Sequence, residues 1–285
     1  MPSPELTSTR SPRVAAARRL AKRAHRAGER RFLAEGPQAV REAAALPGTL
    51  VELYATAETA ERYPDIVDLA RAQKVPVLSA STDVIAAISQ TVTPQGIVGL
   101  CRFVDVPLAS LTADTPPDLV AVLAHVRDPG NAGTVLRAAD AAGAEAVVLT
   151  DASVDLYNPK TVRASVGSLF HLPVAVGARV EDTIAQLRAA GLRILAADGA
   201  GESDLDAEID AGGLDGPTAW IFGNEAWGLP EETRALADAV VRVPIHGRAE
   251  SLNLATAAAV CLYASARAQR GSSGCRTSRA GGAAR

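Results

Sequence analysis

The chain has few aromatic residues and few cysteines, and it contains no long apolar run. Phe, Trp and Tyr make up 4% of its 285 residues, and Cys101, Cys261 and Cys275 form no CxxC pair. The cysteine content argues against a disulfide framework or a zinc site and predicts a reduced, cytoplasmic protein. Because no run approaches the length of a membrane span and no apolar stretch follows the N-terminus, we expect neither a transmembrane helix nor a signal peptide.

Common catalytic signatures are also missing. The sequence contains no G-x-G-x-x-G and no G-x-x-x-x-G-K-[ST], so nothing supports a dinucleotide-binding Rossmann site or a phosphate loop. The four histidines show no spacing typical of metal ligands, and no metal site is predicted. No Ser-His-acid trio is evident either, although residues far apart in the sequence could assemble one in space.

The net charge of −3 conceals an uneven distribution. Nine Lys/Arg and a single acid lie between Arg10 and Arg31, whereas the part from Phe32 to Tyr263 holds 15 bases and 30 acids. A basic extension over residues 1 to 28 on an acidic body is a footprint for a polyanion such as RNA. The alternative is a solvated, partly disordered tail, which we expect for residues 271 to 285.

Strand and helix patterns alternate in the first part of the chain. Apolar or β-branched runs predict strands at 31–36, 50–55, 75–78 and 96–103, and helical periodicity falls at 12–27, 40–45, 59–73 and 81–89. This alternation predicts a small α/β domain over residues 29 to 105 with its own core. Residues 106 to 118 hold three prolines with Ser, Thr and Asp, which is the composition of a linker.

A second series of βα units predicts a domain over residues 119 to 270. Strands are expected at 119–124, 146–150, 172–176, 193–197, 219–222 and 240–245, with helices at 131–142, after Asn158-Pro159, at 181–190 and at 254–268. Such units predict a mostly parallel sheet covered on both faces. Ligands of open parallel sheets bind beyond the carboxyl ends of the strands, so the loops at those ends are the place to look for chemistry.

Three loops at expected strand ends have an unusual composition. They are R-D-P-G-N-A-G at 127–133, followed by Arg137, then F-G-N-E-A-W-G-L at 222–229, and V-P-I-H-G-R-A-E-S-L-N at 243–253. Each alone has a simple structural explanation, because Asn131, Ser251 or Asn253 can cap a helix and the glycines can make turns. Arg137 can likewise lie on a solvated helix face. Together, in this order, the loops are far more specific.

The three loops resemble the three motifs of the SpoU (TrmH-like) RNA ribose methyltransferases, over most of residues 119 to 264. F-L-A-E-G at 32–36 and T-P-Q-G-I at 93–97 resemble the substrate-binding domain that precedes the catalytic domain in many members. That domain is itself similar to a ribosomal RNA-binding protein. The layout is similar to actinomycete enzymes that methylate large-subunit ribosomal RNA and confer antibiotic resistance.

The resemblance implies an α/β fold whose carboxy-terminal segment passes through a loop to form a deep trefoil knot, a rare exception to unknotted topology. S-adenosylmethionine would bind in the knot, held mainly by backbone groups. The implied contacts lie around residues 195–198 and beyond, and they are Leu195, Ala196, Gly223, Val243, Ile245 and Leu252. Glycine permits close approach of a backbone to a ligand, and the apolar side chains can flank an adenine.

The resemblance also implies methyl transfer to a ribose 2′-hydroxyl, an in-line displacement that needs an aligned and deprotonated oxygen. The family pattern assigns activation of the hydroxyl to Arg137, although a guanidinium is normally protonated and a poor base. Phosphate binding and stabilisation of the developing alkoxide are the alternative roles. The remaining catalytic candidates are Asn131, Glu225, Ser251 and Asn253, and the candidate RNA contacts are Arg127, Arg163, Arg18, Arg19, Lys22 and Arg23.

Partners and alternatives follow from the same resemblance. The alanine-rich helix at 254–268 would form a homodimer interface, in which the arginine of one subunit serves the pocket of the other. We expect 23S ribosomal RNA as the substrate. A tRNA substrate is one open alternative, and a non-catalytic RNA-binding protein on the same fold is another. The intact polar residues of the three motifs weigh against the second alternative.

Overall fold

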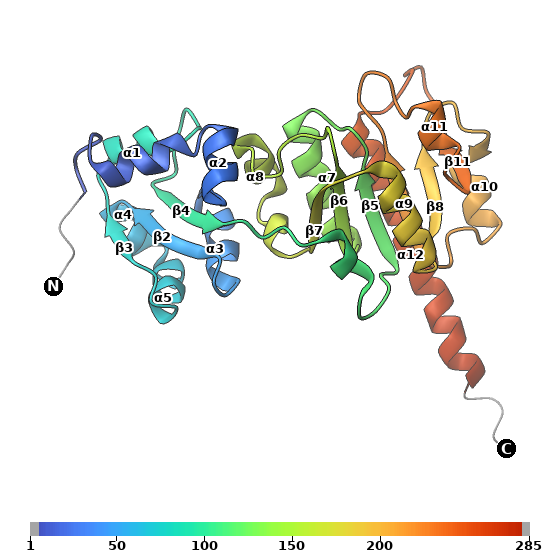
Figure 1. Ribbon diagram of the computed structural model, residues 1–285. Coiled ribbons are helices and arrows are strands. Elements are labelled where there is room, and N and C mark those ends of the chain that lie inside the picture. Colours follow the sequence, from blue (N-terminus) through green and yellow to red (C-terminus); the bar gives the residue numbers. More distant parts are fainter. Residues whose placement is uncertain (1–5, 281–285) are drawn as a thin grey trace. The chain divides into compact units, whose positions relative to one another are not determined.

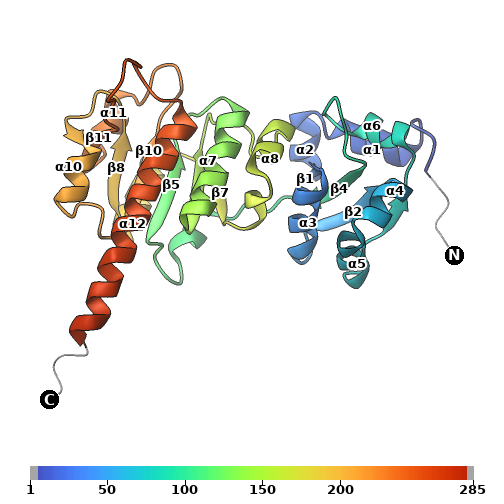
Figure 2. The ribbon, with the colours of Figure 1, turned by 180° about the vertical axis from the view of Figure 1, so that it is seen from behind.

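The computed structural model describes residues 6 to 280, with the backbone alone for 272 to 280, and it separates into two compact units (Figures 1 and 2). The N-terminal unit comprises the residues up to Val104 together with Asp155–His171. The C-terminal unit comprises Asp105–Val154 and the residues from Leu172 onward. Among the described residues, no helix has both the length and the apolar character needed to cross a membrane.

A four-stranded sheet forms the centre of the N-terminal unit, in the strand order β1-β4-β2-β3. Strand β4 runs antiparallel to β1 and β2, and β3 is parallel to β2. The strands are β1 (Arg31–Glu35), β2 (Leu50–Ala55), β3 (Val77–Ser79) and β4 (Ile97–Arg102). The helices are α1 (Pro12–Arg19), α2 (Arg23–Glu29), α3 (Pro37–Ala45), α4 (Ala57–Arg62), α5 (Pro64–Ala72), α6 (Thr82–Ile88), α8 (Pro159–Ser165) and the 3-10 turn η2 (Ser168–Phe170).

Helix α1 belongs to the core of the N-terminal unit. Val14, Ala17 and Leu20 are at most 3% exposed and pack into a cluster that includes Tyr54 of β2. Leu6 forms a bridge to the backbone beside β3, so the chain is attached to this unit before α1 begins. These contacts correct the prediction of a separate basic extension over residues 1 to 28, because the apolar side of α1 is needed to cover the sheet.

The segment 155–171 also differs from its prediction, since it packs in the N-terminal unit and not with the parallel sheet. The ring of Tyr157 stacks on Phe103 with 3.7 Å between the centroids. The guanidinium of Arg26, which is 3% exposed, contacts the carboxylate of Asp155 at 2.5 Å. A buried charge requires such a partner. Both contacts join residues more than fifty positions apart, which periodicity in the sequence does not reveal.

One predicted helix is divided by a proline. The single helix expected over residues 59–73 consists of α4 and α5, which meet at Tyr63. Pro64 has no backbone N–H to continue α4 and instead begins α5, at the position where proline is favoured.

The C-terminal unit is built on a seven-stranded sheet in the order β7-β6-β5-β10-β8-β11-β9, and every pairing in it is parallel. The predicted parallel sheet is therefore confirmed. Its strands are β5 (Leu119–Leu123), β6 (Ala146–Thr150), β7 (Val174–Ala178), β8 (Arg193–Ala197), β9 (Ser203–Asp204), β10 (Thr218–Phe222) and β11 (Ala239–Arg242). The helices are η1 (Leu108–Thr112), α7 (Pro129–Ala142), α9 (Val180–Ala189), α10 (Leu205–Asp210), α11 (Glu231–Arg234) and α12 (Leu254–Ala280).

Helices cover both faces of this sheet. Helices α7 and α12 lie side by side on one face, and α9 covers the other (Figures 1 and 2). The indole Nε1 of Trp220 in β10 donates to Ser265 Oγ of α12 at 2.8 Å, and both residues are fully buried. This bond fixes α12 to a central strand of the sheet.

Two predictions about irregular segments are corrected in this unit. Leu111 of η1 is 7% exposed and packs in the core beside Val180, so residues 106–118 are not a free linker. Helix α12 continues to Ala280 and includes residues 271 to 280, which we predicted as disordered. The rest of that predicted tail, residues 281 to 285, lies outside the described residues.

Candidate functional site

A cavity of about 720 Å³ lies at the carboxyl ends of β8, β10 and β11. The segments that follow these strands form its walls, and the starts of α7 and α12 close it. The position agrees with the rule for ligands of open parallel sheets. Eight predicted site residues line it: Asn131, Gly223, Glu225, Val243, Ile245, Ser251, Leu252 and Asn253. The cavity therefore brings together residues from all three loops.

The carboxylate of Glu225 binds the beginning of α7. It accepts hydrogen bonds from the backbone N–H groups of Arg127 (3.3 Å) and Asp128 (3.2 Å) and from Asn131 Nδ2 (3.1 Å). A negative charge is favourable at a helix N-terminus, where N–H groups lack partners within the helix. Asp128 is the cap of α7 and accepts from the backbone N–H of Asn131, which leaves the Asn131 side chain available for the site.

Asn131 also connects to the third loop. Its Oδ1 accepts from Asn253 Nδ2 at 3.1 Å. Asn253 Oδ1 in turn accepts from the backbone N–H groups of Ala255 and Thr256, so this side chain caps α12. The simple structural explanation is thus correct for Asn253, and the same side chain serves the polar network. Ser251 lies on the cavity wall and is exposed.

The second loop closes tightly on itself. Asn224 and Gly228 exchange two backbone hydrogen bonds of 2.9 Å. A Cβ atom at Gly223 would lie 2.5 Å from the backbone carbonyl group of Gly228, so only glycine fits at residue 223. The side chain of Asn224 ties this loop to the segment that leads into the first one by donating to the carbonyl oxygen of His125, two residues after β5, at 2.9 Å.

The cavity has the mixed lining that S-adenosylmethionine requires. Val243, Ile245 and Leu252 provide partly exposed apolar surface for a flat base, and polar groups of the three loops stand beside them. Asp198 adds a carboxylate, whose oxygens accept from the backbone N–H groups of Ala200 (2.9 Å) and Leu229 (3.2 Å). The residues present fit an adenosine group that carries a cationic sulfur centre.

Two predicted cofactor contacts lie one and two residues before the part of the chain that lines the cavity. Leu195 and Ala196 lie inside β8, are completely buried and do not line the cavity. Ala197, Asp198 and Gly199, at the end of that strand, occupy the cavity wall. The correction follows from the geometry of a central strand, whose interior residues face the covering layers while its carboxyl end faces the ligand.

Arg137 is exposed on the surface of α7 and does not line the cavity. Among the described residues it has no hydrogen-bond or ion-pair partner. The exposed Ala141 follows Arg137 by one helical turn, and the hydroxyl of Tyr263 from α12 donates to the Ala141 carbonyl oxygen at 3.3 Å. Arg137 therefore lies on the outer surface formed by α7 and α12 and not on the wall of the cavity.

Arg127 is joined to the cavity through its backbone, whose N–H donates to the cavity residue Glu225. Its guanidinium carbon is 4.9 Å from the ring centroid of Trp227, a side chain that sequence reasoning did not single out. Trp227 is 51% exposed although it is a large aromatic residue. Its position in the second loop, two residues after Glu225, was the available signal, because ligands of parallel sheets bind at such loops.

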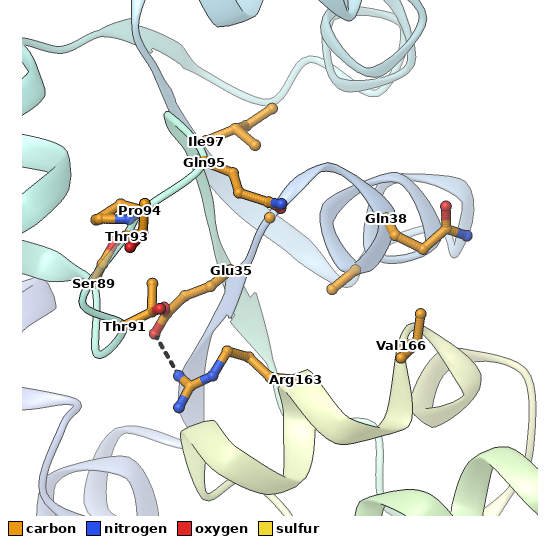
Figure 3. Close-up of a pocket in the computed structure, with 12 residues that line it drawn as sticks. Glu35, Gln38, Ser89, Thr91, Thr93, Pro94, Gln95, Ile97, Arg163 and Val166 are labelled. Atoms are coloured by element: carbon orange, nitrogen blue, oxygen red, sulfur yellow. Dashed lines mark hydrogen bonds and ion pairs between the residues drawn. The ribbon is translucent and has the colours of Figure 1, made fainter.

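The other predicted RNA contacts belong to the N-terminal unit. Arg18, Arg19, Lys22 and Arg23 are all exposed along α1, α2 and the turn between them. Arg163 of α8 lines a cavity of about 400 Å³ and contacts Glu35 Oε1 at 3.4 Å (Figure 3). The Glu35 side chain is 5% exposed, and its Oε2 has no hydrogen-bond partner among the described residues. Burial of this carboxylate raises the pKa of Glu35.

Two family descriptions match the chain and together cover most of it. The SpoU rRNA Methylase family matches residues 118–263, which contain the cavity and all three loops. The MRM3-like substrate binding domain matches residues 11–99. The second match begins immediately before α1, which agrees with the place of that helix in the core of the N-terminal unit.

Individual relatives match this protein over more than nine-tenths of the chain. A 23S rRNA (guanosine(2553)-2′-O)-methyltransferase from Bacillus subtilis is 32% identical over 91% of this chain and 98% of its own length. A crystal structure of an AdoMet-bound rRNA methyltransferase from Sinorhizobium meliloti superposes with a TM-score of 0.80 at 35% identity, covering 92% of this chain and 97% of that one. The SpoU methyltransferase AviRb from Streptomyces viridochromogenes, in complex with AdoMet, gives 0.76 at 28% identity, covering 92% of this chain and 99% of that one.

Proposed function

Because the chain belongs to the SpoU rRNA methylase family, we propose that it transfers a methyl group from S-adenosylmethionine to a ribose 2′-hydroxyl of 23S ribosomal RNA. The observation that carries the proposal is the cavity in which side chains of all three motifs are joined by hydrogen bonds. A 23S ribosomal RNA substrate is supported by the activity of the Bacillus subtilis relative. We also propose that the protein acts in the cytoplasm, where ribosomal RNA is made.

The cavity residues have distinct roles in this proposal. S-adenosylmethionine supplies a methyl group activated by the positive charge on sulfur. Val243, Ile245 and Leu252 hold the base of the cofactor, and Gly223 allows the backbone to approach it closely. Asn131 and Glu225 keep the first and second loops in one arrangement, which fixes the direction from which the ribose can enter.

The 2′-hydroxyl must lose a proton, and Arg137 is the candidate for its activation. A guanidinium stays protonated in most environments, so we assign Arg137 the binding of the adjacent phosphate and the stabilisation of the developing alkoxide. Arg137 is exposed and does not line the cavity of its own subunit. We therefore propose that it completes the cavity of a second subunit.

An apolar stripe on α12 supports a homodimer. Val260 (40% exposed) and Tyr263 (52% exposed) stand one turn apart on its outer surface, and the Tyr263 hydroxyl contacts α7 four residues beyond Arg137. Large apolar side chains exposed together mark interaction sites. A symmetric contact through this surface would bring the Arg137 residues of both subunits to the interface.

We propose that the chain forms a trefoil knot where the cavity is built. The segment after β11 and the loop after β10 both line the cavity, so these two parts of the chain meet there. Their meeting beyond the strand ends supports a threaded C-terminus. The resemblance of the three loops to the SpoU motifs implies the same knot.

A mixed dimer tests the shared site. One subunit carries Arg137→Ala, the other carries Glu225→Ala, and each has a different affinity tag so that the mixed species can be purified. If Arg137 serves the partner, the intact cavity of the first subunit receives an arginine from the second, and about half of the wild-type turnover returns. A mixed dimer as inactive as both parent variants would refute the exchange of arginines.

The substrate is tested by supplying tritiated S-adenosylmethionine with purified 23S ribosomal RNA or with total tRNA. We expect label in the first and not in the second. Preferential labelling of tRNA would show that the substrate is tRNA and not 23S ribosomal RNA. Binding of 23S ribosomal RNA without label in either RNA would indicate a non-catalytic RNA-binding protein.

A further inference from the structure

One large aromatic side chain is placed where burial does not explain it. The chain has two tryptophans, and their surroundings are opposite: Trp220 is fully buried, whereas Trp227 is 51% exposed. Trp227 is in the loop between Glu225 and Gly228, both of which line the cofactor cavity. A half-exposed indole presents a flat apolar face and a polar N–H, which suit it to binding a ligand.

The arginine beside it covers part of the ring. The Arg127 guanidinium carbon lies 4.9 Å from the indole centroid, within the range of a cation–π contact. The backbone N–H of Arg127 is bound by Glu225, so the two side chains are held by the network that shapes the cavity. With a cation on one side and half of its surface exposed, Trp227 offers a flat aromatic surface in the loop whose neighbouring residues, Glu225 and Gly228, line the cavity.

A flat aromatic surface beside a cation matches the chemistry of an unpaired nucleobase. Proteins bind single-stranded nucleic acid by stacking bases on aromatic side chains, and arginine adds cation–π attraction and charge. Sequence-specific RNA recognition mostly targets single-stranded loops and bulges, and a base that has left regular helical stacking there needs a new stacking partner. No carboxylate among the described residues is paired with Arg127, which leaves its charge available to the RNA.

We propose that Trp227 and Arg127 form a stacking platform for an unpaired base of the RNA substrate, at or next to the nucleotide that receives the methyl group. The platform rests on the proposed RNA methyltransferase function and adds a binding site to it. Stacking does not read hydrogen-bonding groups, so the platform holds a base in place without selecting its identity.

The test uses the full chain, 23S ribosomal RNA and four proteins: wild type, Trp227→Ala, Trp227→Phe and a control, Ile209→Ala. Ile209 is a suitable control because it is 41% exposed in the same unit, on α10, and does not line the cavity. We expect Trp227→Ala to weaken RNA binding about tenfold and to raise the KM for RNA. Trp227→Phe retains most of the affinity, and the affinity for S-adenosylmethionine is unchanged in all four.

Fluorescence provides a readout that a purely structural role would not move. Since Trp220 is buried, Trp227 supplies the exposed tryptophan emission, and RNA should quench it in the wild type and protect it from acrylamide. Quenching should disappear in Trp227→Ala, which retains Trp220.

Three results would overturn the platform: unchanged RNA affinity in Trp227→Ala, a loss of cofactor affinity in that variant, or its dissociation into monomers in sedimentation. The last result would make Trp227 a subunit contact. Failure of the wild type itself to bind or methylate 23S ribosomal RNA would instead refute the proposed function. The two failures are therefore distinguishable.

Discussion

The side chain of Asn253 donates a hydrogen bond to Asn131 Oδ1 at 3.1 Å, across 122 positions of the sequence. It connects the residue that caps α12 to the first turn of α7, and Asn131 in turn donates to Glu225. One asparagine thus joins all three loops of the cavity. The arrangement explains why the motifs need amide side chains, which donate and accept at the same time.

Asn131→Ala should reduce turnover strongly with little effect on folding. The substitution removes the hydrogen bonds to Glu225 and Asn253, so the three loops are no longer held together by one side chain. The reacting groups then lose their alignment. We expect turnover to fall about 100-fold, a magnitude typical of small misplacements in active sites. Because these bonds are exposed to solvent, the free energy of unfolding should change by less than about 1 kcal/mol.

Single-turnover methylation and urea unfolding measure the two quantities. Thr134→Ala is the matched control, since Thr134 lies one turn further along α7 and is exposed. Its hydroxyl bonds only the Gly130 carbonyl oxygen among the described residues. Turnover within threefold of wild type in Asn131→Ala would show that the network does not position the reaction.

Gly223→Ala should damage the cavity in a way that Gly199→Ala does not. Both glycines line the cavity, but a Cβ at residue 223 meets the Gly228 backbone at 2.5 Å, whereas nothing lies within 4 Å of one at residue 199. Backbone atoms cannot move aside as a flexible side chain would. We expect Gly223→Ala to lose about 1–3 kcal/mol of stability and most of its cofactor affinity.

Chemical denaturation and calorimetry with S-adenosylmethionine compare the two variants. Equal stability and equal cofactor affinity in both would contradict the close approach at Gly223.

The loops of the site could be predicted because sequence order and strand direction are enough to bring them together. Asn131, Glu225 and Asn253 follow the ends of parallel strands or begin the next helix, so they meet at one edge of the sheet. The prediction that Leu195 and Ala196 line the cavity differs from the structure because sequence order alone does not show where a strand ends. A resemblance identifies a segment, but which of its residues faces the cavity depends on where β8 ends.

The sequence did not reveal which of the two units a segment belongs to where contacts between distant residues decide it. Helix α1 reads as basic, yet Val14 and Leu20 fill the core of the N-terminal unit. The segment 155–171 follows a strand of the parallel sheet in the sequence, but Tyr157 and Asp155 find their partners on Phe103 and Arg26. Neither aromatic stacking nor a buried ion pair between distant segments leaves a periodic signal.

Basic residues on the N-terminal unit should contribute to the salt dependence of RNA binding. Deleting residues 1 to 28 would remove part of the core, so substitutions are the suitable test. Replacing Arg18, Arg19, Lys22 and Arg23 together by alanine should reduce the slope of log affinity against log salt by about 0.8 for each RNA phosphate that the variant no longer neutralises.

Filter binding between low and moderate salt measures this slope. Lys22→Ala and Lys74→Ala form a matched pair, because both lysines are exposed in the N-terminal unit and Lys74 follows α5, outside the basic cluster. An unchanged slope in the fourfold variant would show that the cluster does not bind RNA.

The buried carboxyl of Glu35 should make stability depend on pH. Burial raises its pKa above the ordinary value of 4.5, so the folded protein holds this proton more tightly than the unfolded chain. Below pH 4.5 both states are protonated and the residue costs nothing. As pH rises through 4.5 toward the raised pKa, the unfolded state ionises first, and folding loses stability from this group.

Glu35→Gln removes the titration and keeps the shape. The free energy of unfolding of this variant, relative to wild type, should therefore increase as pH rises from 4 to 7. Urea unfolding at several pH values measures the difference. A difference that is constant with pH, or that falls as pH rises, would show that burial does not raise the pKa of Glu35.

The central claim is methyl transfer to a ribose oxygen, and the position of the transferred methyl group tests it most directly. After reaction with tritiated S-adenosylmethionine, 23S ribosomal RNA is hydrolysed with alkali, which cleaves every linkage except one that follows a 2′-O-methylated ribose. We predict that the label appears in a single alkali-resistant dinucleotide, and that Arg137→Ala yields none. Label released as a methylated base, or no label from wild-type protein that binds the cofactor, would contradict the account.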